Sequence, residues 1–272
     1  MRSLIEFLNE TQSSKNQIWD YVSPSRLNLW LKCPLAFRRK YIDGIETLTT
    51  PNLFVGKVTH DVLDGIYRCA MLNAYVTSDD VPGFVDDAWQ RVMVSDSCSF
   101  DDEEHETKCR NQVIDLVKTY LSEIDITAEK PLLVEQKFET PLYDPSNGED
   151  IGLPLVGIVD LVLEGETGPV VIDFKTAASA SYCDLTYEIQ LTAYAYLIRE
   201  FYGYDESELQ VRQLVKTKTP KIVTHRFPRR TDEHFERFFG LIREYCEALD
   251  KGVFNYRPSW NCSLCEHVWT CV

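Results

Sequence analysis

Hydrophobic and polar positions follow two different periods along the chain, and the change comes near residue 131. Before that point apolar residues recur three or four positions apart, most clearly over residues 55–71. This spacing is typical of amphipathic helices, and it predicts further helices over residues 85–94 and 104–124. The first half of the chain is therefore predicted to be mostly helical.

The N-terminal region begins with a polar stretch and continues into a broken helix. Residues 1–20 are weakly periodic and are expected to form a short helix or a loosely held arm. Ser23 is a suitable N-cap for the next helix, because a proline follows it at the first helical position. The apolar spacing of residues 27–37 is broken at Cys33, which precedes another proline. Cys33 is therefore expected at a helix junction.

Short apolar runs with strand-like alternation begin after residue 131 and are separated by turn-forming residues. Four strands are predicted, over residues 132–139, 155–163, 170–176 and 210–216. An amphipathic helix over 186–201 separates the third and fourth strands, and a last helix is predicted over 232–250. Strands joined by a crossing helix and flanked by further helices predict an α/β or α+β fold.

The chain has no internal repeat and no low-complexity linker, so a single domain over residues 1–272 is expected. The domain is predicted to consist of a helical part (1–130), a sheet core (131–220) and a C-terminal helix with a Cys-rich tail (221–272).

Charge is distributed unevenly along the sequence. The formal net charge of −15 argues against a protein that coats nucleic acid by bulk attraction. Residues 79–106 hold ten acidic residues and one arginine, whereas residues 212–230 hold seven basic residues and no acidic one. A second basic cluster lies within residues 26–40. We expect the acidic stretch to be a solvated face, while the basic stretches permit a polyanionic partner.

No apolar run approaches the roughly 20 residues needed to span a bilayer, and the first ten residues lack the features of a signal peptide. No membrane association is expected, and the protein is predicted to be cytoplasmic, in a reducing compartment. In that setting nine cysteines indicate metal binding or buried thiols rather than disulfides.

An acid and an amine lie near the end of the strand predicted over residues 170–176. Side chains alternate between the faces of a strand, so Asp173 and Lys175 share one face. A hairpin to the preceding strand brings Asp160 opposite Asp173 or one residue diagonal to it. Carboxylates about 5 Å apart repel each other unless they are protonated or bridged by a cation. Hard oxygen ligands of this kind suit Mg²⁺ or Mn²⁺.

Two polar residues of the following helix add to this pair. Gln190 and Tyr194 are i, i+4 neighbours and therefore leave one helical face. Taken alone, an Asp-x-Lys pair on a strand is common as a surface ion pair, and polar side chains at a helix edge need no function. A catalytic site is favoured because Asp160, the Asp173–Lys175 pair and the Gln190–Tyr194 pair follow one another along the chain in this order.

Four short motifs together resemble the PD-(D/E)xK nuclease superfamily, and specifically its RecB-like branch. They are Gly56-x3-His60, Gly157-x2-Asp160, Asp173-x-Lys175 and Gln190-x3-Tyr194. The resemblance implies a restriction-endonuclease-like mixed sheet flanked by helices, and a deoxyribonuclease that depends on Mg²⁺ or Mn²⁺.

The resemblance also implies a role for each motif residue. The implied metal ligands are His60, Asp160, Asp173 and the carbonyl of Phe174. Lys175 would orient or deprotonate the attacking water, and Gln190 and Tyr194 would position the substrate or Lys175.

The C-terminal tail carries three cysteines in a C-x2-C-x5-C pattern, at Cys262, Cys265 and Cys271. Closely spaced thiolates can bind one metal ion or cluster, and a closed zinc or iron-sulphur site needs four such ligands. Either His267 or the distant Cys33 can supply the fourth. Thiolate spacing alone does not choose between tetrahedral zinc and a cubane.

The arrangement of one early and three late cysteines resembles the iron-sulphur subgroup of RecB-like nucleases, which includes AddB-type nuclease domains and CRISPR-associated exonucleases. This resemblance implies a structural 4Fe-4S cluster, with Zn²⁺ as the alternative metal. The implied cluster ligands are Cys33, Cys262, Cys265 and Cys271.

The function expected from these features is hydrolysis of DNA by an exonuclease that acts on single-stranded ends. The basic stretches at residues 212–230 and 38–40 are expected to contact phosphates. Two alternatives stay open. One is a non-catalytic nuclease-like subunit that joins a protein partner in a DNA-processing complex, and the other is a zinc-binding adaptor. Enzymes of DNA repair and of CRISPR adaptation would look alike in sequence.

Overall fold

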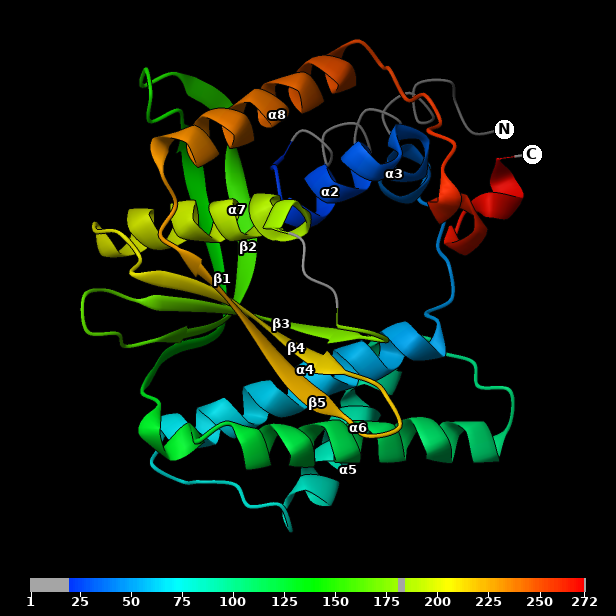
Figure 1. Ribbon diagram of the computed structural model, residues 1–272. Helices are drawn as coiled ribbons and strands as arrows, with labels where there is room; N and C mark the ends of the chain where they lie inside the picture. The colour runs from blue at the N-terminus through cyan, green and yellow to red at the C-terminus, as the bar shows by residue number, and fades with distance from the viewer. Residues whose placement is uncertain (1–19, 181–183, 272) are drawn as a thin grey trace, which may run out of the picture.

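The computed structural model describes residues 20–180 and 184–271, and a five-stranded sheet lies at its centre (Figure 1). The strands lie in the order β1-β2-β3-β4-β5, and every neighbouring pair is antiparallel except β3 and β4, which are parallel. Their bounds are Pro131–Tyr143 (β1), Asp150–Leu163 (β2), Val170–Ala177 (β3), Glu208–Val215 (β4) and Lys221–Pro228 (β5). The prediction of a mixed sheet in an α/β fold is confirmed.

Helix α7, Asp184–Tyr202, makes the crossover that joins the parallel strands β3 and β4. Parallel neighbours require such a connection, because a tight turn reverses the chain direction. The apolar side of α7, which includes Leu191 and Leu197, is buried against the sheet. The residues on α7 that face β2 and β3 are thereby held against the centre of the sheet.

Helices α4 (Pro51–Met71) and α6 (Glu103–Glu123) cover the other face of the sheet, and α5 (Val81–Ser95) packs against both of them. Figure 1 shows them below the sheet, with α4 nearest to β3. Their buried side chains form one hydrophobic core together with Ile172 and Phe174 of β3. The three helices predicted here are confirmed: α4 and α5 begin four residues earlier than the periodicity indicated, and α6 is shifted by one residue.

The second core lies on the α7 side and includes α2 (Pro24–Lys32), α3 (Pro34–Tyr41) and α8 (Asp232–Asp250). Val171 of β3 belongs to this core, whereas its neighbour Ile172 belongs to the other. β3 is therefore buried on both faces, which explains why its sequence reads as a continuous apolar run.

The helix junction predicted at Cys33 is present. The Ser23 hydroxyl accepts a hydrogen bond from the Arg26 amide at 3.3 Å and so caps α2. Cys33 has extended backbone, with φ of −164°, and separates α2 from α3. Pro34 then begins α3, because its missing amide proton costs nothing in the first turn.

The C-terminal tail returns to the N-terminal helices. It contains two 3₁₀ turns, η2 (Trp260–Leu264) and η3 (Val268–Thr270), which lie beside α3 in Figure 1. Arg39 donates to the Thr270 carbonyl at 3.0 Å, and Arg257 donates to the Leu31 carbonyl at 2.6 Å. Direct hydrogen bonds thus join regions that lie more than two hundred residues apart.

One strand was missed by the sequence analysis. Residues 212–230 were predicted to be the end of a strand and a basic segment, but they form most of the β4–β5 hairpin. Charged and polar residues on β5 conceal its alternation, since only Phe227 of that strand is buried. The arm predicted over residues 1–20 lies almost wholly outside the described residues. Within the described chain, no helix is long and apolar enough to cross a membrane.

Candidate active site

Two glycines allow helices on opposite faces to approach the sheet closely. A Cβ atom on Gly157 of β2 would lie 2.6 Å from Leu197 Cδ1 of α7, and one on Gly56 of α4 would lie 2.9 Å from Thr176 Oγ1 of β3. Both separations are well below a normal van der Waals contact, so a larger residue would push the helix away. These glycines therefore bring α7 and α4 against the strands that carry the predicted carboxylates.

Asp173 is the hub of a hydrogen-bonded cluster on β3. It is 1% exposed and accepts hydrogen bonds at its Oδ1 from Lys175 Nζ at 2.7 Å and from Gln190 Nε2 at 2.8 Å. Gln190 Nε2 also donates to the Tyr194 hydroxyl at 2.8 Å. The structure thus brings the polar face of α7 onto the strand pair Asp173 and Lys175.

Asp160 and His60 approach the same strand end. The β2–β3 ladder ends at the pair Leu161 and Ile172, so Asp160 and Asp173 are the next positions along it. The Phe174 amide donates to Asp160 Oδ2 at 2.8 Å. His60 Nδ1 lies 3.7 Å from that same oxygen. One residue from α4, one from β2 and three from β3 therefore converge.

Burial dominates the electrostatics of this cluster. It raises the pKa of Asp173 to about 6 although Lys175 opposes the shift, and it also raises the pKa of Asp160. Burial, and then the Lys175 charge, lower the pKa of His60 to about 4, so its imidazole is neutral near pH 7. Burial alone would lower the pKa of Lys175, but the two carboxylates outweigh it and the pKa is raised.

The charges in the cluster do not balance. At neutral pH the carboxylates of the buried Asp173 and the half-buried Asp160 face one ammonium and a neutral imidazole, which leaves one negative charge in excess. A buried charge without a partner is costly, so a cation at this strand end would stabilise the site.

Comparison with known protein families matches residues 21–272 to the PD-(D/E)XK nuclease superfamily. The chain belongs to this superfamily. Among solved structures it is similar to a protein from Eubacterium rectale described as a "putative exonuclease", with a TM-score of 0.55 and 13% sequence identity. That similarity covers 98% of this chain and 93% of the other, and at this identity it shows a shared fold alone. A comparison with curated proteins gave no match.

The side chains near Asp173 in this PD-(D/E)XK chain include the atom types that bind a divalent metal ion. Asp160 and Asp173 offer carboxylate oxygens and His60 a neutral imidazole, which are ligands that Mg²⁺ or Mn²⁺ accepts. Within residues 20–180 and 184–271, however, no three His, Cys, Asp or Glu side chains are arranged to hold one metal ion. Lys175 Nζ instead lies 2.6 Å from Asp173 Oδ2, so a bound cation would compete with this ammonium.

Glu135 of β1 lies within electrostatic range of the same cluster. Burial raises its pKa, and Asp64, Asp61 and Asp160 raise it further. Its backbone has φ of +44°, a left-handed conformation that is unusual for a residue with a side chain. Glu135 therefore adds negative charge near the Asp160 end of the site.

The four cysteines of the sequence motifs line one cavity of about 300 Å³ between α2, α3 and the tail. They are Cys33, Cys262, Cys265 and Cys271, and none forms a disulfide. Burial raises the pKa of the Cys271 thiol, and the other three cysteines each raise it further, which places all four near one another. They do not form a site for a single ion, because no three of them meet that geometry in the described chain.

His267 lines the same cavity and keeps the identity of a fourth ligand open. It is 4% exposed, and its Nδ1 is buried without a hydrogen-bond partner among the described residues. Buried polar atoms normally have a partner, so this nitrogen is available to a group inside the cavity.

A buried network beneath the site was not found by sequence reasoning. Arg212 of β4 is 4% exposed and pairs with Glu129 at 2.6 Å, so it is not available for the phosphate contact predicted for it. It also donates to the hydroxyls of Tyr67 and Tyr120, at 3.0 and 2.6 Å. The rings of both tyrosines pack on Phe174. No local motif reveals this network, because its members come from four separate segments.

The second predicted basic cluster is also partly occupied by internal contacts. Arg38 and Arg39 both hydrogen bond to Asp43, at 3.3 and 3.1 Å. Lys40 is exposed, and it lines the cysteine cavity together with Lys32. Positive charge near the tail therefore comes from these lysines more than from the arginines.

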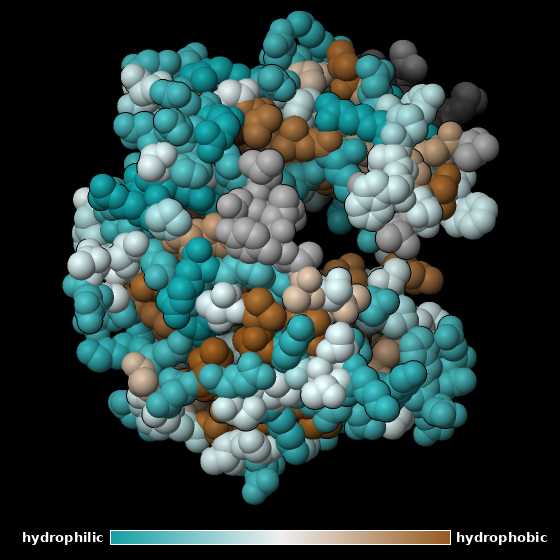
Figure 2. Space-filling model, in the orientation of Figure 1, coloured by the Kyte–Doolittle hydropathy of each residue, from teal (hydrophilic) through white to brown (hydrophobic). Residues whose placement is uncertain are grey.

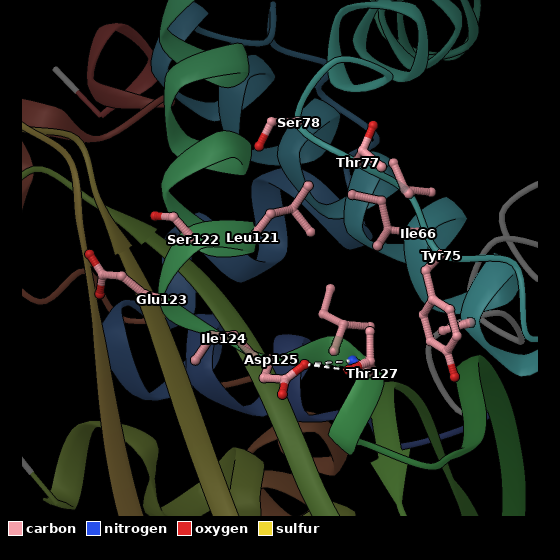
Figure 3. A pocket seen from close by; sticks show the side chains of 13 residues that line it. Ile66, Tyr75, Thr77, Ser78, Leu121, Ser122, Glu123, Ile124, Asp125 and Thr127 are labelled. Carbon is pink, nitrogen blue, oxygen red and sulfur yellow. Dashed lines mark hydrogen bonds between the residues drawn. The ribbon is translucent and has the colours of Figure 1, made fainter.

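A further cavity of about 380 Å³ lies at the far end of α4 (Figure 3). Its wall includes Ile66 and Leu121, and Asp125 is hydrogen bonded there to Thr127. None of the residues predicted for the site lines it. His60 lies six residues before Ile66, about 9 Å along the helix axis, so this cavity is separate from the cluster around Asp173.

Proposed function

We propose that the protein is a DNA nuclease that depends on Mg²⁺ or Mn²⁺ and removes nucleotides from single-stranded ends. The observation that carries this proposal is the cluster of Asp160, Lys175 and Gln190 around the buried carboxylate of Asp173, which has an excess of negative charge in a PD-(D/E)XK fold. A surface ion pair would not need a buried carboxylate, nor a helix packed so closely on the strand that the contact requires glycine.

Each residue of the cluster has a defined task in this proposal. Asp160, Asp173, His60 and the Phe174 carbonyl would hold the metal ion. When bound, such an ion polarises the phosphate and lowers the pKa of a water molecule. Lys175 would orient the attacking water through its ammonium, which lies beside Asp173. It could accept the water's proton only after losing its own, which a cation bound in place of the ammonium would favour.

Gln190 holds Asp173 in one orientation through its side-chain amide, and Tyr194 fixes Gln190 in turn. Preorganised groups of this kind support catalysis because they need no rearrangement during the reaction.

The shape around the site offers space for a DNA strand. Figure 2 shows the molecule hollowed between the helices above and α4 below, and β3 ends beside this hollow in the same view of Figure 1. The structurally similar Eubacterium rectale protein, described as a putative exonuclease, is consistent with this mode. We therefore propose DNA, in single-stranded form, as the substrate.

We expect the full chain to shorten a 5′-labelled single-stranded oligodeoxynucleotide in Mn²⁺ or Mg²⁺ and to be inactive in EDTA, because the excess negative charge of the cluster requires a cation. Denaturing gels of a time course provide the measurement. A covalently closed single-stranded circle is the control, since it has no end and should survive.

Cleavage of the circle would show endonuclease action. An absence of cleavage in both metals, or cleavage that persists in EDTA, would contradict the proposal and favour the non-catalytic scaffold.

We also propose that the cysteine cavity holds a structural 4Fe-4S cluster, with zinc as the rival. The support is that Cys33, Cys262, Cys265 and Cys271 all line one cavity of about 300 Å³. The thiolates of a cubane bind four different iron atoms and so stand further apart than the ligands of one zinc ion. The cluster would join the two ends of the chain and contribute a few kcal/mol by loop closure.

Anaerobically purified protein is expected to be brown and to contain about four iron atoms per chain. Cys33→Ala and Cys265→Ala should lose iron and folded protein, whereas Cys69→Ala on α4 should keep both. His267→Ala tests the fourth ligand, since it should retain iron if Cys33 fills that place. Colourless protein with about one zinc ion per chain would support the zinc alternative instead.

A further inference from the structure

A cavity of about 550 Å³ adjoins the cluster on the side of β1 and β2. Gln190 and Tyr194 of α7 form one end of it, and the segment that begins α2 forms the opposite wall. Gln190 lines this cavity and also donates to Asp173 at 2.8 Å, so the cavity lies next to the proposed metal site. The remaining wall is formed by β1 and β2 through Lys137, Glu139, Val156, Gly157 and Ile158.

Among the described residues, no helix covers the part of the sheet that forms the floor of this cavity. Ile158 is 49% exposed although it lies within β2. It is opposite Lys137 of β1, and Val156 is opposite Glu139. Asp160 lies two residues further along β2. The exposed stretch of β2 that lines the cavity therefore ends close to the carboxylate of Asp160.

Tyr21 provides a fixed aromatic wall. The Arg26 guanidinium lies 3.6 Å from the centroid of the Tyr21 ring and also donates to the Tyr21 carbonyl at 3.0 Å. The neighbouring Val22 exchanges backbone hydrogen bonds with β2, at 2.9 Å to the Pro154 carbonyl and 2.8 Å from the Val156 amide. A ring held in this way is preorganised for stacking, which favours binding of a flat ligand.

Polar donors lie beside this aromatic wall. Lys137 supplies an exposed ammonium, and Ser23 and Ser25 supply hydroxyls at the first turn of α2. The positive end of the α2 dipole points the same way, which favours an anion. Glu139 also lines the cavity and moderates its positive charge. The cavity thus combines an apolar, aromatic wall with donors suited to a phosphate.

We infer that this cavity is a nucleotide subsite for the DNA strand next to the bond that is cut. A base would stack on Tyr21 and the exposed Ile158, while a backbone phosphate would lie near Lys137 and the start of α2. A free phosphate would not need the aromatic wall, and a purely apolar ligand would not need the lysine and the serines. The inference rests on the proposed nuclease function, because it takes the neighbouring cluster as the cutting site.

Tyr21→Ala tests the stacking wall. Its Kd for a fluorescein-labelled twelve-nucleotide oligothymidylate, measured by anisotropy in Ca²⁺, should rise about tenfold, within the range of one lost base stack. Tyr21→Phe should bind like the wild type, because the ring remains. Tyr204→Ala is the matched control, since Tyr204 is 53% exposed and lies outside the cavity.

Lys137→Ala tests the phosphate contact by a different readout. Binding to single strands loses affinity with salt in proportion to the number of phosphates neutralised. Loss of one contact should make the slope of log K against log salt shallower by about 0.7. Lys130→Ala, at an exposed lysine of the segment before β1, should leave the slope unchanged. A merely structural role for Lys137 would not alter this slope.

The same variants separate the two proposals. If the wild type cuts DNA and the Tyr21→Ala and Lys137→Ala variants bind and cut like it, the subsite is excluded and the nuclease function stands. If the wild type does not cut but its binding depends on Tyr21 and Lys137, the nuclease function fails and the subsite stands as a binding site. Tyr21→Phe with weak binding despite unchanged melting would also exclude stacking as the role of Tyr21.

Discussion

The Lys175→Ala variant is expected to lose about 10²- to 10⁴-fold in kcat for cleavage of a single-stranded oligodeoxynucleotide, which is the usual contribution of a positioned general acid or base. Lys175 is the amine that lies within 2.7 Å of both oxygens of Asp173, so its removal takes away the group that orients or deprotonates the attacking water. KM should change little, because the amine acts on the water rather than on the bound strand.

Asp173→Asn should be at least as damaging. The amide keeps the shape of the side chain and its contact with Gln190, but it removes a charge from the proposed metal site. Both variants should be compared with the wild type at saturating Mn²⁺, with melting temperature as a check on folding.

Lys251→Ala is the matched control, because Lys251 is a 63% exposed lysine at the end of α8. Equal rates for the wild type, Lys175→Ala and Asp173→Asn would end the catalytic proposal and leave a nuclease-like scaffold. A raised KM with unchanged kcat in Lys175→Ala would instead assign that amine to strand binding.

The parts of the site that could be predicted from sequence are those set by short-range geometry. Strand period two puts Asp173 and Lys175 on one face, and the short hairpin between β2 and β3 brings Asp160 beside them. The i, i+4 spacing joins Gln190 to Tyr194. In each case the secondary structure fixes which side chains are neighbours, so the sequence pattern predicts the contact without knowledge of the tertiary fold.

The parts that could not be predicted depend on contacts between distant segments. Arg212 looks like a surface charge in sequence, in a stretch of seven basic residues with no acidic one. Its partner Glu129 lies eighty-three residues earlier, and nothing local links the two. The same reason explains β5, whose pairing with β4 rather than its own hydrophobic pattern makes it a strand.

Cys33 is an intermediate case. Its place at a helix junction follows from the proline after it, and the structure confirms that junction. Its position beside the tail cysteines depends on the path of the whole chain, and motif resemblance rather than local geometry indicated it. The local sequence therefore predicts the helix junction at Cys33, but not which distant residues Cys33 lies beside.

Arg212→Ala is expected to lower the free energy of unfolding by about 3–5 kcal/mol, which is the usual cost of breaking a buried ion pair on one side. Arg212 is 4% exposed, and its guanidinium donates at 2.6 Å to Glu129 and to the Tyr120 hydroxyl. Burial raises the pKa of Tyr120 to about 12, so this phenol stays neutral and Glu129 is the carboxylate that balances the guanidinium.

Urea unfolding followed by intrinsic fluorescence measures this loss, and Arg226→Ala provides the matched control. Arg226 pairs with Glu208 at the same distance of 2.6 Å, but its side chain is 64% exposed. An exposed pair contributes at most about 1 kcal/mol, so the two variants should differ severalfold. A loss below 1 kcal/mol for Arg212→Ala would show that water or repacking replaces the ion pair.

A large loss would carry a consequence for the active site. Tyr67 and Tyr120 pack on Phe174 with ring centroids 6.0 and 5.8 Å away, and the backbone of Phe174 binds Asp160. Arg212 holds both tyrosine hydroxyls, so its removal frees the rings that support this strand end. In the folded fraction of Arg212→Ala, the concentration of Mn²⁺ needed for half-maximal cleavage should therefore rise, whereas Arg226→Ala should leave it unchanged.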